Sequence, residues 1–246
     1  MKFDLVFPTP LMNAAGSLGF APDMRRMSSL GELGAFVTNP VSLSPRSPAQ
    51  SRGLIAFSGG FLLHSGYPNP GLKAVIRRYA LRWARADMPV IVHLLAQGED
   101  EISSMVSRLE NVDGVSAVEI GLPPDTSKEL AIRLIQAGIG ELPVIARLPL
   151  ERAQELAELV SQAGTAAVSL SPPRGAIPAP DGGLLRGRLY GPAIYPQALL
   201  VVQALARSGI PVIGGGGVYR HADAEAMLSA GALAVQLDSV LWRGWK

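Results

Sequence analysis

Short apolar runs recur along the chain, and longer segments with helical spacing lie between most of them. Each run is rich in Val, Ile and Ala and is apolar at both odd and even positions. This pattern is typical of strands that are covered on both faces, as in a parallel sheet. Seven such runs are LGAFVTNPV from Leu33, MPVIVHLLA from Met88, GVSAVEIGL from Gly114, LPVIARL from Leu142, AGTAAVSLS from Ala163, IPVIGGGG from Ile210 and AGALAVQLDS from Ala230. PLMNAAGSLG from Pro10 supplies an eighth.

Helical spacing is found at 101–111, 127–137, 151–163, 192–208 and 222–230, and several of these segments end at a glycine, as helices commonly do. Eight strands alternating with helices predict a (β/α)8 TIM barrel, as one domain over residues 1–246, with a small extra strand at residues 5–7. An open doubly wound sheet is the alternative, but there the glycine-rich turn would follow the first strand. Only SVLWRGWK follows the eighth strand, which predicts a shortened C-terminal helix.

Two connections are longer than ordinary loops. Residues 42–71 follow the second strand, with a hairpin expected around Ser58-Gly59-Gly60, and residues 171–190 follow the sixth. Both connections leave the C-terminal ends of strands, which is the face where barrels carry their sites. We therefore expect them to cover the functional site.

Composition narrows the classes of function. The chain of 246 residues is 48% hydrophobic with a net charge of +2, and no run of basic residues suggests nucleic-acid binding. It has no cysteine, which excludes disulfides, thiolate metal sites and a cysteine base, and its three histidines are dispersed, so no metal site is expected. Neither a signal peptide nor a membrane-spanning run is found, so the cytoplasm is the expected location.

Four consecutive glycines at 214–217 join the seventh strand to the following helix. Free backbone amides at a helix N-terminus, with no Cβ in the way, form an anion site, so the segment predicts phosphate binding. The alternative is a tight turn without a ligand.

Several motifs together resemble those of the dihydroorotate dehydrogenases. They are MNAAGSLG, FVTNPVSLSPR, HSGYPNPG, GRLYGPAIYPQAL, IPVIGGGGV and AGALAVQL, which span about Leu5 to Ser239 in the order and spacing of that family. The resemblance implies an FMN-containing (β/α)8 barrel that acts on a small-molecule substrate. It also implies a homodimer, as in the family's soluble class, or a partner subunit.

The resemblance also implies site residues. The FMN phosphate would rest on Gly191, Gly215, Gly216 and Gly217. The flavin ring would lie over Ala15 and Gly16 with Thr38 nearby, and Arg147 would stand where the family has a lysine beside flavin N1. The substrate pocket would contain Asn39, His64, Asn69 and His93.

Departures from the family concentrate where its chemistry takes place. After the fourth strand the family carries a Cys or Ser general base, but this chain has EIGLPPDTSKE, with Gly121 replacing an asparagine and Pro123 and Pro124 near the position of the base. Proline has no proton to exchange, so no catalytic residue is assigned. Asn39 and His93 replace a lysine and an asparagine. Because a site built for polar pairing loses much affinity without these groups, dihydroorotate is not the expected substrate.

Several polar residues have two interpretations each. Asp238-Ser239 replaces a glycine-threonine pair, and Asp238 would either repel the phosphate or cap a helix beginning at Ser239. Arg188 and Arg220 could compensate for it. Arg147 would stabilise a reduced flavin or form a salt bridge with Glu119. His93 and His64 are candidate proton carriers or packed histidines.

The sequence is compatible with three functions. The first is an FMN-dependent oxidoreductase of the CH–CH type that acts on a substrate other than dihydroorotate. The second is a catalytically degenerate barrel that serves as a binding or interaction module, suggested by the proline pair, Asp238 and the short C-terminus with Trp242 and Trp245. The third is a barrel that binds a sugar or nucleotide phosphate.

Overall fold

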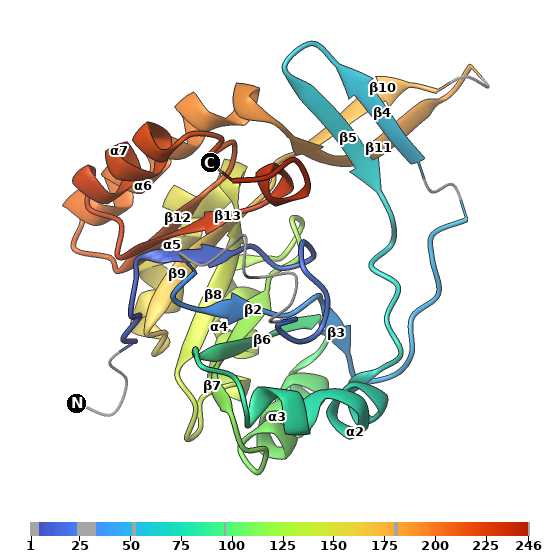
Figure 1. Ribbon diagram of the computed structural model, residues 1–246, viewed down its shortest axis with the longest axis vertical. Helices are drawn as coiled ribbons and strands as arrows, with labels where there is room; N and C mark the ends of the chain where they lie inside the picture. Colours follow the sequence, from blue (N-terminus) through green and yellow to red (C-terminus); the bar gives the residue numbers. More distant parts are fainter. Residues whose placement is uncertain (1–4, 24–32, 51–52, 96, 180–181, 246) are drawn as a thin grey trace.

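Eight parallel strands form the barrel that the sequence predicts (Figure 1). The computed structural model describes residues 5–23, 33–50, 53–95, 97–179 and 182–245. The order around the barrel is β1-β13-β12-β9-β8-β7-β6-β2, and a parallel bridge between Met12 and Ala35 joins its ends. The strands are β1 (Leu11–Asn13), β2 (Phe36–Val37), β6 (Val90–Leu95), β7 (Val115–Gly121), β8 (Val144–Pro149), β9 (Ala167–Ser171), β12 (Val212–Gly215) and β13 (Ala234–Leu237).

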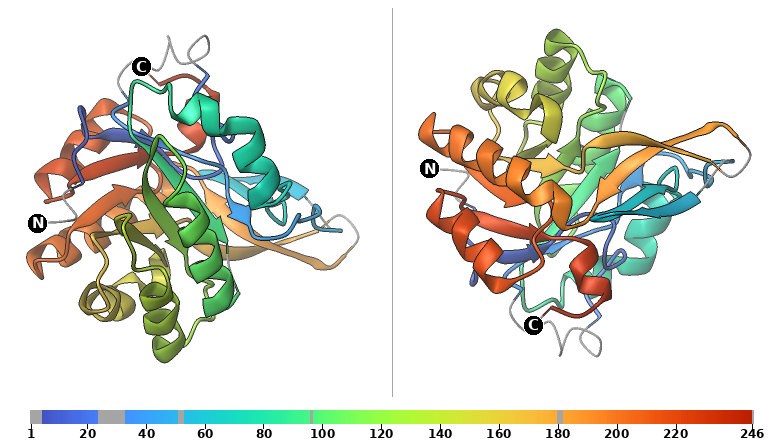
Figure 2. Two further views of the ribbon diagram at one scale, coloured as in Figure 1. Left: turned by 90° about the horizontal axis from the view of Figure 1, so that it is seen from below. Right: turned by 90° about the horizontal axis from the view of Figure 1, so that it is seen from above.

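Helices surround the strands (Figure 2). They are α2 (Leu72–Trp83), α3 (Glu99–Leu109), α4 (Lys128–Ala137), α5 (Ala153–Gln162), α6 (Tyr195–Arg207) and α7 (His221–Ser229), with 3-10 turns η1 (Leu150–Arg152) and η2 (Pro192–Ile194) before α5 and α6. Helices α3 to α7 confirm the five predicted helical segments, and most of their ends lie within two residues of the predicted ends. Helix α2 was not predicted. None of the helices in the described part of the chain is long and apolar enough to cross a bilayer.

The structure of the first and last described segments tests two predictions, the strand at residues 5–7 and the shortened C-terminal helix. The short 3-10 helix η3 (Ser239–Trp242) follows β13, which confirms the shortened C-terminal helix. The strand predicted at residues 5–7 is wrong, because these residues pair with no neighbouring strand. Leu5 and Phe7 instead pack against the apolar interior of the barrel, so burial of their side chains decides their position.

The barrel interior is apolar towards the N-terminal ends of the strands, which we call its lower part, and polar towards their C-terminal ends. The lower part holds Met12, Ala35, Val37, Ile91, Ala117, Ile145, Ala167, Ile213 and Ala234. Two residues further along their strands, towards the C-terminal ends, lie His93, Glu119, Arg147, Ser169 and Gln236, all buried. Because side chains alternate along a strand, these five polar groups also point inward. They form the floor of the candidate site.

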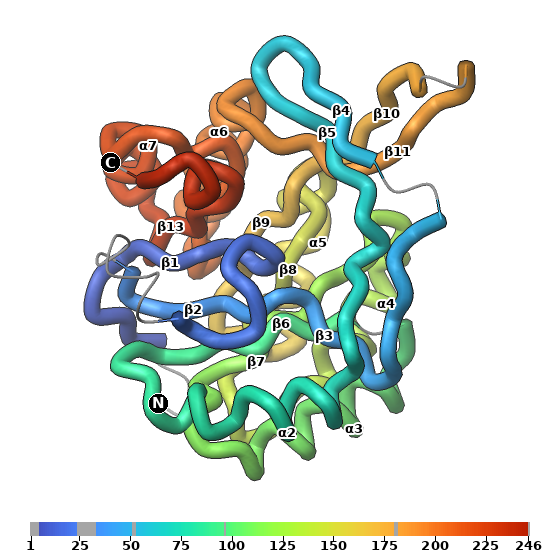
Figure 3. The backbone as a smooth tube through the Cα atoms, turned by 45° about the vertical axis from the view of Figure 1, so that its right-hand side comes forward, coloured from blue at the N-terminus to red at the C-terminus, as the bar shows by residue number. Residues whose placement is uncertain are grey.

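The two long connections form a second sheet beside the barrel (Figure 3). It is antiparallel with the order β10-β11-β5-β4, and it consists of β4 (Gly53–Phe57), β5 (Gly60–His64), β10 (Arg174–Pro178) and β11 (Leu184–Tyr190). The predicted hairpin around Ser58-Gly59-Gly60 is the β4–β5 hairpin. Its partner β10–β11 belongs to the other connection, so segments over a hundred residues apart meet. One further short strand, β3 (Val41–Ser42), pairs with β6.

Candidate functional site

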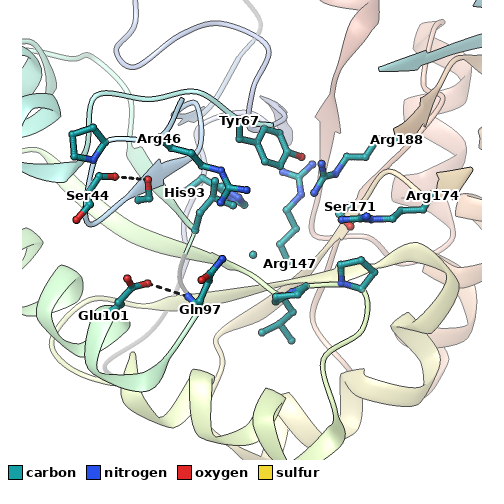
Figure 4. Close-up of a pocket in the computed structure, with 17 residues that line it drawn as sticks. Ser44, Arg46, Tyr67, His93, Gln97, Glu101, Arg147, Ser171, Arg174 and Arg188 are labelled. Atoms are coloured by element: carbon teal, nitrogen blue, oxygen red, sulfur yellow. Dashed lines mark hydrogen bonds between the residues drawn. The ribbon is translucent and has the colours of Figure 1, made fainter. Parts of the chain in front are cut away.

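Two cavities lie at the C-terminal ends of the barrel strands. The larger one, which we call the arginine cavity, has a volume of about 460 Å³ (Figure 4). Its lining residues are Ser42, Ser44, Pro45, Arg46, Tyr67, His93, Leu95, Gln97, Glu101, Gly121, Leu122, Pro123, Pro124, Arg147, Ser171, Arg174 and Arg188. The smaller one, the small cavity, has about 130 Å³ and is lined by Ala15, Gly16, Ser17, Asn39, Pro40, Leu63, Ser65, Tyr67, Pro68, Tyr190, Asp238, Ser239 and Trp242. Tyr67 lies between them.

Positive charge dominates the larger cavity. Among the residues that the structure describes, its lining contains four arginines but a single carboxylate, Glu101, whose Oε2 accepts the Gln97 amide at 3.1 Å. Arg147 is paired with the buried Glu119 beneath it. The other three, Arg46, Arg174 and Arg188, form no ion pair with any acidic group that the structure describes. The cavity is therefore arranged to receive an anion.

Glu119 on β7 is the centre of the polar floor. Its Oε2 lies 2.6 Å from His93 Nδ1 and 3.2 Å from an Arg147 nitrogen. Its Oε1 accepts hydrogen bonds from the Ser169 hydroxyl at 2.6 Å and the Gln236 amide at 2.8 Å. Groups from four other strands thus meet on one carboxylate. The salt bridge considered for Arg147 is present, and it holds this guanidinium at the base of the cavity.

The ionisation of the floor follows from these contacts. Burial raises the pKa of Glu119, but Arg147 and the hydrogen bonds from His93 and Ser169 outweigh it, so the net pKa lies below its usual range. Burial lowers the pKa of His93 more than Glu119 raises it. His93 is therefore neutral near pH 7, and its Nδ1 donates to Glu119. The lone pair on Nε2 is left as a hydrogen-bond acceptor.

Gly121 makes room for His93. A Cβ at position 121 would lie 2.9 Å from His93 Nε2 and 3.0 Å from its Cε1, closer than side chains normally approach. Both residues replace asparagine in the family pattern, and the two changes fit each other. Any larger residue at 121 would force the imidazole to shift from this position.

We expect Gly121→Ala to lower stability by about 1–3 kcal/mol, the usual cost of overpacking, because the added methyl group would press on the buried His93 ring. It should also shift the imidazole resonances of His93 in an NMR spectrum. Gly98→Ala is the matched control, since a Cβ there has no neighbour within 4 Å. An unchanged His93 environment in the Gly121 variant would contradict this assignment.

The glycines at 214–217 pack against the chain itself. A Cβ on Gly217 would lie 2.5 Å from the Tyr195 amide nitrogen and 2.9 Å from the Gly191 carbonyl oxygen. A Cβ on Gly216 would contact Ala198 at 3.3 Å, and one on Gly215 would contact Gln236 at 3.2 Å. Close approach of η2 and the start of α6 thus explains why Gly216 and Gly217 lack side chains, whereas Gly215 faces Gln236 on β13. Neither cavity is lined by these glycines or by Gly191.

The surroundings of the small cavity do not fit FMN as they stand. Asp238 accepts hydrogen bonds from both the amide and the hydroxyl of Ser239, as a helix cap does, so that amide is not free for a phosphate. Tyr190 stacks on Phe61, with ring centroids 5.3 Å apart, directly before Gly191. The space left, about 130 Å³, is less than half the lower end of the roughly 300–1,000 Å³ typical of ligand pockets.

The predicted site residues are divided among several environments. Ala15, Gly16 and Asn39 line the small cavity, whereas His93 and Arg147 line the arginine cavity. Thr38 is fully buried, and its hydroxyl accepts the His93 amide at 3.0 Å.

Two of the residues predicted for the substrate pocket line neither cavity. Asn69 stabilises the connection in which it lies, because its Oδ1 accepts hydrogen bonds from the backbone amides of Ser42 and Gly71 at 3.1 and 3.0 Å. His64 lies on β5, opposite Gly53. Arg220, considered as a partner for phosphate, pairs with Asp223 at 2.6 Å.

The convergence of Arg46, Arg174 and Arg188 on one cavity was not predicted from the sequence. Arg46 lies in the first long connection, and the other two lie on β10 and β11 of the second. The only signal in the sequence was that both connections leave the same face of the barrel. Within the described ranges, no group of three or more His, Cys, Asp or Glu residues could hold a metal ion.

Comparisons with known proteins agree with the fold. The family model described as dihydroorotate dehydrogenase matches residues 2–132. The catalytic subunit of dihydroorotate dehydrogenase B (NAD(+)) from Desulforudis audaxviator is 30% identical, covering 96% of this chain and 83% of that protein. Dihydroorotate dehydrogenase A (fumarate) from Limosilactobacillus reuteri is 26% identical over 96% of this chain and 84% of its own.

A solved structure shows the same architecture. The dihydroorotate dehydrogenase of Eimeria tenella, in complex with ferulenol, superposes with a TM-score of 0.78 over 98% of this chain and 78% of that one, at 16% identity. Members of this family are flavoproteins that typically use FMN. Sequence and fold together show that the chain belongs to the dihydroorotate dehydrogenase family.

Proposed function

We propose that this member of the family binds a small anionic metabolite in the arginine cavity and does not oxidise dihydroorotate. The observation that supports this most is the set of four arginines around one cavity, whose described lining residues include a single carboxylate. Guanidinium groups recognise carboxylates and phosphates through paired hydrogen bonds. The proposal develops the binding-module alternative and places the anion at the arginines, away from the glycine turn.

The loop after β7 argues against the family's usual reaction. Leu122, Pro123 and Pro124 line the cavity where the resemblance places the general base. None of these side chains can exchange a proton. His93 is the nearby group that could accept one, but Gly121 and Glu119 hold it in the floor. The chain has therefore changed the chemistry of the site while keeping the barrel.

An FMN-dependent oxidoreductase that acts on another substrate is the second candidate. Arg147 favours it, since a buried guanidinium at this position would stabilise negative charge on a reduced flavin. Ala15 and Gly16 also contribute no large side chain to their part of the wall of the small cavity. Movement of Tyr67 and Tyr190 would be needed to admit the ring.

A visible spectrum and a thermal-shift series separate the two candidates. Protein isolated from cells supplied with riboflavin should lack the flavin absorption band at about 450 nm. Sulfate or inorganic phosphate should raise Tm above the value in sodium chloride of equal ionic strength, by about 2–4 °C for each kcal/mol of binding free energy. Yellow protein with one flavin per chain would establish the second candidate. Equal Tm values in all three salts would exclude the anion site.

The cytoplasmic location stays a prediction from the sequence, in which no signal peptide or membrane-spanning run was found. The homodimer or partner subunit stays a prediction of the resemblance. The relative from Desulforudis audaxviator is named as a catalytic subunit, which supports a subunit role for this chain as well. Sedimentation of the purified chain would test it.

A further inference from the structure

The two ends of the arginine cavity differ in charge, and this difference indicates the class of ligand. Resting on the proposed anion site, we infer that the ligand is a small phosphorylated carboxylic acid. Its phosphate would lie between Arg174 and Arg188, and its carboxylate would lie at Arg46. Figure 4 shows Arg46 on one side of the cavity, Arg174 and Arg188 on the other, and Arg147 between them.

Arg174 and Arg188 are direct cross-strand partners on β10 and β11. Residues opposite each other in an antiparallel pair project from the same face, and like charges there destabilise the sheet. Neither guanidinium has a carboxylate partner within the described ranges. An anion between them would remove this repulsion. Two guanidinium groups with the Ser171 hydroxyl beside them match the nearly two negative charges of a phosphate monoester.

Arg188 is also held in place. Its guanidinium carbon lies 4.1 Å from the centre of the Tyr67 ring, a cation–π contact. Tyr67 has a φ of 53°, and among the residues described it alone combines a side chain with a positive φ. Such backbone conformations persist where the surroundings impose them, often at ligand sites. The strained Tyr67 therefore holds Arg188 in position at the proposed phosphate site before a ligand binds.

A single cation forms the opposite end. Arg46 Nε donates to the Gly66 carbonyl at 2.7 Å, and its backbone exchanges two hydrogen bonds with Asn69 at 2.8 and 3.0 Å. The terminal nitrogens of Arg46 then remain for a ligand. One fixed guanidinium suits a singly charged carboxylate, which it can bind through two parallel hydrogen bonds.

His93 completes the site from below. Its Nε2 accepts hydrogen bonds, since Nδ1 donates to Glu119. A hydroxyl between the phosphate and the carboxylate would donate to it. The cavity of about 460 Å³ has room for such a metabolite and is much larger than one inorganic ion needs.

Calorimetric titrations of the full chain test the two ends separately. The probes are 2-phosphoglycolate, 3-phosphoglycerate and 4-phosphoerythronate, which increase in length, with glycerol 3-phosphate and glycerate as the single-ended controls. The best double-ended compound should bind at least about tenfold more tightly than either control. Arg46→Gln should abolish this advantage without weakening glycerol 3-phosphate. Arg174→Gln should weaken every phosphate compound and leave glycerate unchanged.

Arg186→Gln is the matched charge control. Arg186 lies two residues before Arg188 on the same strand, is exposed and does not line the cavity, so its loss should leave every affinity unchanged. Arg174→Gln should not lower the Tm of the ligand-free protein, because it removes a like-charge pair.

Some results would overturn this inference alone, and others would also remove the proposed function. Equal binding of 3-phosphoglycerate and glycerol 3-phosphate, or equal losses from Arg186→Gln and Arg174→Gln, would overturn the two-ended site while the anion site remained. Absence of binding by all five compounds, together with no stabilisation by phosphate, would overturn both.

Discussion

Replacing Glu119 with glutamine should destabilise the protein by about 3–5 kcal/mol, the range seen when one partner of a buried ion pair is removed. The change keeps the size of the side chain but leaves Arg147, which is only 6% exposed, without a counter-charge. It also disturbs the hydrogen bonds from His93, Ser169 and Gln236. At roughly 2–4 °C per kcal/mol for a chain of this size, Tm should fall by about 6–20 °C. Chemical denaturation followed by circular dichroism would measure the loss.

Glu99→Gln is the control for removal of an acidic side chain. Glu99 pairs with Arg133 at 2.7 Å, but both side chains are about half exposed, so the loss should be about 0–1 kcal/mol. Equal losses in the two variants would contradict a special role for the buried carboxylate.

The pH dependence gives a second measurement on the Glu119 variant. Because folding lowers the pKa of Glu119 below its usual value of 4.5, its stabilisation is complete above that pH and is lost as the pH falls further. Folding also lowers the pKa of His93 below 6.5, so below that pH the unfolded chain binds more protons at this residue than the folded protein does. Acidification therefore lowers stability through His93 as well. The wild type should thus lose stability steadily below pH 6.5. Below pH 4.5 the Glu119→Gln variant should give a flatter curve.

Gly217→Ala should cost more stability than the same change at a glycine of equal backbone conformation. Gly217 has a φ of 71°, and a Cβ there would collide with the Tyr195 amide and the Gly191 carbonyl. We expect a loss of stability of about 1–2 kcal/mol from placing an alanine in the left-handed backbone region. Displacement of the start of α6 should add a further loss of about 1–3 kcal/mol. The equilibrium free energy of unfolding is the quantity to compare.

Gly209 provides the matched position. Its φ is 73°, and nothing lies within 4 Å of a Cβ built there, so Gly209→Ala isolates the backbone cost. If both variants were equally stable and only Gly217→Ala lost phosphate binding, the glycine turn would be a ligand cradle. That result would restore the FMN phosphate site implied by the resemblance.

The local pattern of the chain was enough to predict the barrel. Apolar runs that are buried on both faces, separated by helical segments ending in glycine, leave few other arrangements, because such strands must be covered on both sides. The Ser58-Gly59-Gly60 hairpin was also predicted, and the Asp238 cap was one of the two interpretations considered, since both depend on contacts between near neighbours in the chain. Residues 5–7 were harder, because an apolar segment can satisfy its side chains in the core without pairing as a strand.

The candidate site depended on contacts that the sequence does not specify. The glycine run has an unambiguous conformational meaning, but only the fold shows that α6, and not a ligand, occupies the space beside Gly217. Similarly, Gly121 and His93 were each recognised as departures from the family, yet their fit to one another is a matter of tertiary distance. Arg174 and Arg188 became a pair only through the register of β10 and β11.

The sequence by itself thus determined the barrel and the family, because periodicity and residue identity are local properties. Tertiary structure decided where the charge lies. Arg46, Arg174 and Arg188 come from two separate connections, and only the closure of the barrel brings the ends of those connections over one cavity. Electrostatic attraction for a ligand depends on distance in space, so the arginine cavity could be recognised only once the chain was folded.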